Sequence, residues 1–118
     1  MRQWLCDTSI MCTQHLLGEH CEAHMFVGTI NKGTSIQGYL DNNLLEPEFL
    51  VGRHTELVNE MIKRGMNHQS NLPILNIDNL TDLQRTTTID RERSLNDLLT
   101  RCPLCKEKND EQLQGKKK

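Results

Sequence analysis

The chain has 118 residues, with 14 Lys and Arg against 16 Asp and Glu, a formal charge of −2, and only one Trp, one Tyr and two Phe. This balance excludes a generally basic nucleic-acid-binding protein. No run approaches the roughly 20 apolar residues of a membrane span, and the start of the chain has no apolar secretory segment. We therefore expect a cytoplasmic protein of one small domain, with a core of Leu, Ile, Met and Val.

Charge is unevenly distributed along the chain. Residues 1–84 contain five Lys and Arg and ten Asp and Glu, whereas residues 85–118 contain nine and six. The last third is therefore basic although the whole chain is acidic. The five cysteines are odd in number and lack the spacing of a disulfide framework, so we expect reduced thiols.

Apolar periodicity predicts three helices. The first spans residues 14–30, with Thr13 as its N-cap. The second begins at a proline that suits a first helical position and continues over residues 47–65. The third follows Asp90 as N-cap and ends at Pro103, because proline interrupts helical hydrogen bonding.

The segments between these helices lack regular periodicity. Residues 31–45 predict a loop with a short turn of helix, and residues 66–88 an ordered loop packed on the core. Residues 106–118 are charged and predict a solvated or disordered tail, in which residues 116–118 are either a phosphate contact or an incidental basic end. The predicted fold is all-α: a single compact domain of three main helices with long loops over residues 1–105.

The first helix carries a polar stripe on a mostly apolar surface. His15, Glu19 and Glu22 fall within about 60° of one another around the helix axis. Burying carboxylates costs several kcal/mol unless they are paired or functional, so two interpretations remain open. The carboxylates act as general acid or base, or they pair across the bundle with one of three arginines: Arg2, Arg53 or Arg64.

Some residues have metal-ligand spacing. His20 and His24 are four apart on one helix, and Cys102 and Cys105 form a CxxC typical of half a zinc knuckle. Two reduced cysteines at a helix end are the simpler interpretation, since zinc needs four ligands. The missing pair can come from the first helix only if the tail folds back onto it, as His20 with His24 or as Cys12 with Cys21. A thioredoxin-like role is disfavoured because this CxxC ends a helix.

Two segments carry a family resemblance. Residues 14–22 read QHLLGEHCE, and residues 53–67 begin RHTEL and end KRGMN. They resemble the QHLxxEyrE helix and the RxxEL…KRGxN helix and turn of the pyrimidine-dimer DNA glycosylases, the endonuclease V type found in phage. The third helix, which ends TRCP at residues 100–103, has a looser counterpart.

The resemblance implies a DNA repair glycosylase with abasic-site lyase activity. In that family an α-amine at the start of the chain attacks C1′ of the damaged nucleotide and displaces the base through a Schiff base, while a helix glutamate assists this step and the β-elimination. The matching groups are the amine of Met1 and the carboxylate of Glu22. An α-amine has an ordinary pKa of about 7.7 to 8, so a useful fraction is nucleophilic at neutral pH. The remaining residues implied for substrate and DNA binding are Arg2, His15, Glu19, Arg53 and Arg64.

The resemblance further implies damaged double-stranded DNA as the partner, chemistry without a metal or organic cofactor, a monomer without membrane association, and a bacterial or phage-infected host cell. Departures concern the lesion-reading surface: Cys21 replaces a basic residue, His24 or Met25 stands where an arginine is expected, and the Tyr-rich C-terminus is absent. A broader abasic-site lyase fits what remains. The competing hypothesis is a non-catalytic helical DNA- or protein-binding module with a zinc clip through Cys102 and Cys105.

Overall fold

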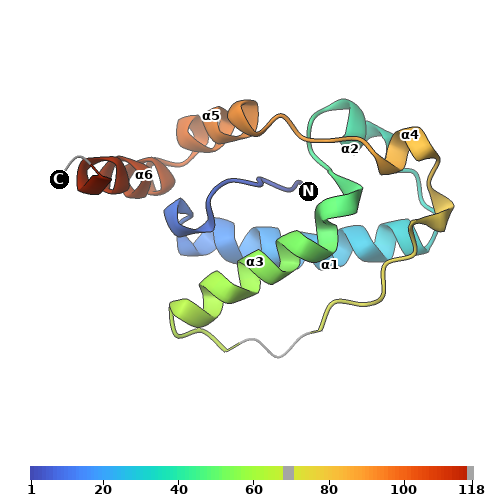
Figure 1. Cartoon of the computed structure of the whole chain (residues 1–118), viewed down its shortest axis with the longest axis horizontal. Coiled ribbons are helices and arrows are strands. Elements are labelled where there is room, and N and C mark those ends of the chain that lie inside the picture. The colour runs from blue at the N-terminus through green and yellow to red at the C-terminus, as the bar shows by residue number, and fades with distance from the viewer. Residues whose placement is uncertain (68–70, 117–118) are drawn as a thin grey trace.

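A computed structural model describes residues 1–67 and 71–116, and within these ranges helices are joined by irregular segments and no strand occurs (Figure 1). The α-helices are α1 (Thr13–Asn31), α2 (Gln37–Asp41), α3 (Leu50–Lys63), α4 (Asp82–Arg85), α5 (Arg91–Arg101) and α6 (Pro103–Lys116). Short 3-10 helices, η1 (Thr8–Ile10), η2 (Pro47–Phe49) and η3 (Ile77–Asn79), lie in the connections. The expected all-α fold is confirmed.

The three helices predicted from periodicity are present as α1, α3 and α5. The N-cap of α1 is Cys12, one residue before the predicted Thr13. Gly65 follows α3 with a φ of 82°, a left-handed conformation that a residue without Cβ adopts at little cost. The Asp90 side chain caps α5 by accepting a hydrogen bond from the backbone N–H of Arg93.

The structure differs from the sequence expectation at the tail, since residues 103–116 form the helix α6 instead of a disordered segment, although the described side chains from Lys106 on are exposed or half-buried, as expected for a solvated tail. Three features of the segment favour the helix. Pro103 suits its first position, Cys105 is fully buried, and the Gln112 side chain donates a hydrogen bond of 2.8 Å to the Ser9 hydroxyl of η1. The proposed phosphate contact at residues 116–118 lies outside the described side chains.

The N-terminal segment runs between α1 and α5 (Figure 1). The Gln3 backbone N–H donates a hydrogen bond of 2.8 Å to the Leu44 carbonyl, and the Ser94 hydroxyl of α5 donates one to the Trp4 carbonyl. These bonds satisfy backbone groups that would otherwise be buried without partners. They hold the first residues of the chain against the loop that follows α2 and against α5.

Two apolar clusters form the core. One surrounds the start of α1 and contains Trp4, Ile10, Met11, Leu16, Leu57, Met61 and Leu98, together with four cysteines: Cys6, Cys12, Cys102 and Cys105. The other surrounds the end of α1 and contains Phe26, Val27, Ile30, Ile36, Leu40, Leu45 and Leu50. All five cysteines are free thiols, as expected. Aliphatic and sulfur-containing side chains therefore make up most of the core, with Trp4 and Phe26 as its aromatic members.

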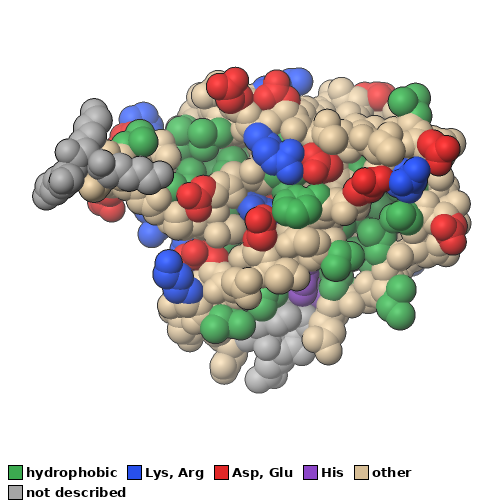
Figure 2. Space-filling model, viewed as in Figure 1, with side chains coloured by type: hydrophobic (Ala, Val, Ile, Leu, Met, Phe, Trp, Pro, Cys, Tyr) green, Lys and Arg blue, Asp and Glu red, His purple; other side chains and the backbone are tan. Residues whose placement is uncertain are grey.

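Charges on the surface are mixed. On the face shown in Figure 2, Lys and Arg are interspersed with Asp and Glu over the visible helices. Within the described ranges, no helix is both long and apolar enough to cross a bilayer.

Candidate active site

A cavity of about 390 Å³ lies where the N-terminal segment meets α1 and the end of α5. We call it the Met1–Glu22 cavity. Its lining consists of Met1, Arg2, Trp4, Gln14, His15, Gly18, Glu19, Glu22, Leu44 and Arg101. Both residues that the resemblance marks as catalytic are therefore in one cavity, together with three of the five residues marked for substrate binding.

Met1 and Glu22 are brought together by a backbone contact. The backbone N–H of Arg2 donates a hydrogen bond of 3.2 Å to Oε2 of Glu22. Both Met1 and Glu22 are half-buried, so each is partly open to solvent. The N–H that binds the Glu22 carboxylate belongs to the residue directly after Met1. Met1 and Glu22 therefore line the same partly open cavity.

The Arg2 guanidinium binds two side chains of α5. Its Nη2 donates a hydrogen bond of 2.9 Å to the Ser94 hydroxyl, and its Nη1 lies 3.5 Å from Oδ2 of Asp97. The guanidinium carbon is 3.8 Å from the centroid of the Trp4 ring, a cation–π contact. Burial lowers the pKa of Arg2, against the opposing effect of the Asp97 charge. These contacts position the first residues of the chain, and hence the α-amine.

His15 forms part of the cavity wall. Its ring packs edge-on against Trp4, with centroids 5.5 Å apart. Burial and the nearby positive charge of Arg101 lower the pKa of His15, while Glu22 works in the opposite direction. The lowered pKa favours the neutral imidazole, and its Nδ1 lies 3.2 Å from Sγ of Cys12.

Glu19 answers the question that the polar stripe left open. Nε and Nη2 of Arg53 donate hydrogen bonds of 2.6 and 3.0 Å to the two carboxylate oxygens of Glu19. The Glu19 side chain is 0% exposed and that of Arg53 3% exposed. Burial works to lower the pKa of Arg53, but the hydrogen bonds and charge of Glu19 outweigh it and the pKa is raised. Pairing across the bundle thus holds for Glu19, whereas Glu22 faces the cavity.

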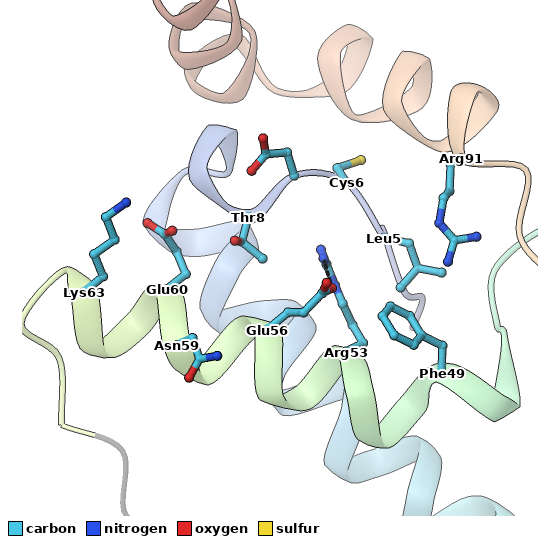
Figure 3. Close-up of a pocket in the computed structure, with 11 residues that line it drawn as sticks. Leu5, Cys6, Thr8, Phe49, Arg53, Glu56, Asn59, Glu60, Lys63 and Arg91 are labelled. Atoms are coloured by element: carbon cyan, nitrogen blue, oxygen red, sulfur yellow. Dashed lines mark hydrogen bonds and ion pairs between the residues drawn. The ribbon is translucent and has the colours of Figure 1, made fainter.

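Arg53 and Arg64 lie away from the Met1–Glu22 cavity. Arg53 lines a different cavity of about 560 Å³ between α3 and the N-terminal segment, where it also binds Glu56 (Figure 3). Arg64 forms an ion pair of 2.7 Å with Glu60 and donates hydrogen bonds to two backbone carbonyls near η1. Both arginines connect α3 to the rest of the molecule.

Arg101 is a cavity residue that the sequence did not single out. It is the last residue of α5, is exposed, and lines the cavity with its guanidinium carbon 5.6 Å from the Trp4 ring centroid. The available signal was the basic last third of the chain and the looser TRCP match. A cation here is suited to a phosphate, which arginine binds through two parallel hydrogen bonds.

Two groups of side chains have metal-binding geometry. The ligand atoms of Cys12, His15, Cys102 and Cys105 all lie within 4.8 Å of one another, and so do those of a second group. The second group adds a histidine of α3 to the predicted pair of α1: His20, His24 and His54.

The fold and cavity define an all-α protein in which the start of the chain meets a helix carboxylate. The family model of the pyrimidine dimer DNA glycosylases matches residues 1–73, about 60% of the chain. The chain belongs to this family, which confirms the resemblance, and it is therefore a DNA repair glycosylase with a DNA substrate at the level of the family. Comparison with curated proteins and with solved structures gave no match.

Proposed function

We propose that the protein is a DNA glycosylase with abasic-site lyase activity, and that the α-amine of Met1 is its nucleophile. The observation that carries the proposal is the shared cavity of Met1 and Glu22, joined by the hydrogen bond from the Arg2 N–H. A nucleophile and a carboxylate at one solvent-accessible point are the two groups that Schiff-base chemistry at a sugar carbon needs.

The proposed reaction is balanced without an oxidant or reductant. The amine lone pair attacks C1′, the bond from C1′ to the base breaks, and the base leaves with the electron pair and gains a proton. The amine then loses a proton, the C1′–O4′ bond breaks with its electron pair on O4′, and O4′ gains a proton, which opens the sugar ring and gives a protonated Schiff base. Glu22 stabilises this cation and accepts the proton from C2′, after which the C3′–O bond breaks and the 3′ phosphate leaves.

The other cavity residues have supporting roles in the proposal. Arg101 binds a phosphate of damaged double-stranded DNA beside the cavity, since its exposed guanidinium lies on the rim. Arg2 positions the amine through its attachment to α5. Glu19 maintains the fold through Arg53 and takes no part in proton transfer. We propose that the protein acts as a monomer.

The charge on the surface of α1 bears on which DNA lesion is the preferred substrate. Cys21 stands where the family has a basic residue, is exposed on α1 and supplies no positive charge to DNA, and the second such position is His24 or Met25 instead of an arginine. We therefore propose that an abasic site, where no base must be displaced, is a better substrate than a pyrimidine dimer.

Strand cleavage tests the proposal directly. Duplexes with an abasic site, a thymine dimer or no lesion are compared at low salt, because phosphate contacts weaken as salt rises. We expect cleavage of the abasic duplex, loss of that cleavage in Glu22→Gln, and unchanged cleavage in the control Glu92→Gln, an exposed acid in the first turn of α5. Cleavage by Glu22→Gln at the wild-type rate would overturn the role of Glu22, and no cleavage of any duplex by the wild type would overturn the lyase.

A further inference from the structure

The cysteine-rich part of the core contains an arrangement that the glycosylase reaction does not use. Cys12 and His15 come from the start of α1, and Cys102 and Cys105 from the junction of α5 and α6. The geometry points to a structural zinc site formed by these four residues, in which three thiolates and one imidazole hold the metal.

The distances fit a tetrahedral zinc ion. Zn–S bonds of about 2.3 Å and a Zn–N bond of about 2.0 Å place two sulfurs about 3.8 Å apart and a sulfur and a nitrogen about 3.5 Å apart. Sγ of Cys12 and Sγ of Cys102 are 3.8 Å apart. Nδ1 of His15 lies 3.2 Å from the Cys12 sulfur and 3.8 Å from that of Cys105. These three distances are thus within about 0.3 Å of those expected around tetrahedral zinc, and all the ligand atoms of the four side chains lie within 4.8 Å of one another.

Backbone N–H groups contact two of the sulfurs. The N–H of Cys12 lies 3.2 Å from the Cys105 sulfur, and the N–H of Cys105 lies 3.4 Å from the Cys102 sulfur. Such N–H donors are the outer contacts that orient and stabilise metal-bound sulfur. A sulfur that accepts a hydrogen bond from the residue three positions later is expected when both cysteines of a CxxC point at one ion.

Two helix N-termini converge on the site. Cys12 is the N-cap of α1, and Cys102 directly precedes Pro103, the first residue of α6. Zn²⁺ with three thiolates has a net charge of −1, and each helix N-terminus contributes about +0.5 elementary charge close by. Cys12, Cys102 and Cys105 are at most 7% exposed, so this electrostatic balance is set in a water-poor environment.

The site would fasten two parts of the molecule together. Cys12 and His15 lie within residues 1–73, which match the family, whereas Cys102 and Cys105 lie beyond them. Metal binding would hold α6 against the start of α1 and fix the His15 ring in the wall of the Met1–Glu22 cavity. The inference does not depend on the proposed lyase, because metal content and DNA cleavage are measured separately.

Metal analysis of the full chain, purified under reducing conditions, tests the site. We expect one zinc ion per chain after dialysis, and at least a tenfold loss of zinc in Cys102→Ser and Cys105→Ser. Cys21→Ser is the matched control and keeps its zinc, because Cys21 is exposed on α1 outside the cluster. Cobalt added to the metal-free wild type should give tetrahedral d–d bands and a thiolate-to-cobalt band. His15→Cys should strengthen the thiolate band, which a merely structural role of His15 would not do.

Three results would overturn the site. The first is a reduced wild-type chain that binds neither zinc nor cobalt. The second is a disulfide between Cys12 and Cys102, seen as two missing thiols that reduction restores without metal binding. The third is a cobalt spectrum without a thiolate band that disappears in His54→Ala, which would place the metal in the histidine group. The cobalt spectrum is recorded on the wild type, so it decides the matter even if a cysteine variant fails to fold.

Discussion

The buried ion pair between Glu19 and Arg53 predicts a large and specific energetic coupling. Removing one partner of a buried pair costs about 3 to 5 kcal/mol, because the other charge stays buried without compensation. Glu19→Met leaves Arg53 with Glu56, whose side chain is 50% exposed, so we expect the lower end, about 3 kcal/mol. Arg53→Met leaves the Glu19 carboxylate at 0% exposure, so we expect a loss of about 4 kcal/mol.

The double variant Glu19→Met with Arg53→Met should recover most of this loss. Replacing both charges by apolar side chains of similar size is often neutral or stabilising, so the free energy of unfolding should lie within about 1 kcal/mol of the wild type. A matched control is Glu48→Met, which breaks the ion pair with Arg85, where the side chains are 49% and 34% exposed. Such an exposed pair is worth about 1 kcal/mol or less.

Urea denaturation followed by circular dichroism measures all four variants against the wild type, and the double-mutant cycle gives the coupling. A loss below about 1 kcal/mol in both single variants would contradict the assignment of Glu19 as a structural residue. So would a double variant whose loss equals the sum of the single losses.

Four further outcomes follow from single contacts. Gly65→Ala should lose about 1 kcal/mol in urea denaturation because its φ is positive, whereas Gly28→Ala, in open space on α1, should gain up to about 1 kcal/mol. Asp90→Ala should lose about 1 kcal/mol with the cap of α5, and an unchanged midpoint would contradict the cap. Burial raises the pKa of Cys6, so the free energy that this thiol contributes to folding is fully present below the ordinary pKa of 9.0 and is lost as the pH rises above it. Cys6→Ala should therefore reduce the loss of stability at alkaline pH. Arg101→Ala should weaken DNA binding and reduce the slope of log affinity against log salt by about 1, and an unchanged slope would contradict its phosphate contact.

The main helices were predictable because their signals are local. Apolar spacing and end residues such as Asp90 and Gly65 define α1, α3 and α5, and the structure confirms them. Helix α6 was not predictable in this way, since few of its residues are apolar. It is stabilised by burial of Cys105 and by contact with η1, which are tertiary interactions that periodicity does not record.

The candidate site likewise contains residues that the sequence predicted and residues that only the structure identifies. Met1 and Glu22 were found through the family resemblance, and the structure places them in one cavity. The choice among three arginines as partner of Glu19 depended on helix packing, so the sequence left it open. For the proposed zinc site, the CxxC of Cys102 and Cys105 was visible in the sequence, whereas the choice of Cys12 and His15 as the other two ligands depends on how α6 packs against α1. The available signal was that Cys12 to His15 and Cys102 to Cys105 have the same spacing, each at the start of a helix.

The most direct test of the active site is to locate the covalent adduct with DNA. Borohydride added during reaction with an abasic duplex reduces the Schiff base to a stable bond, and peptide mass spectrometry then identifies the modified amine. We expect one adduct, on the α-amine of Met1, and none after that amine is blocked by acetylation. An adduct on a lysine side chain, or no adduct under conditions that trap a control lyase, would contradict the proposed role of the Met1 amine as nucleophile.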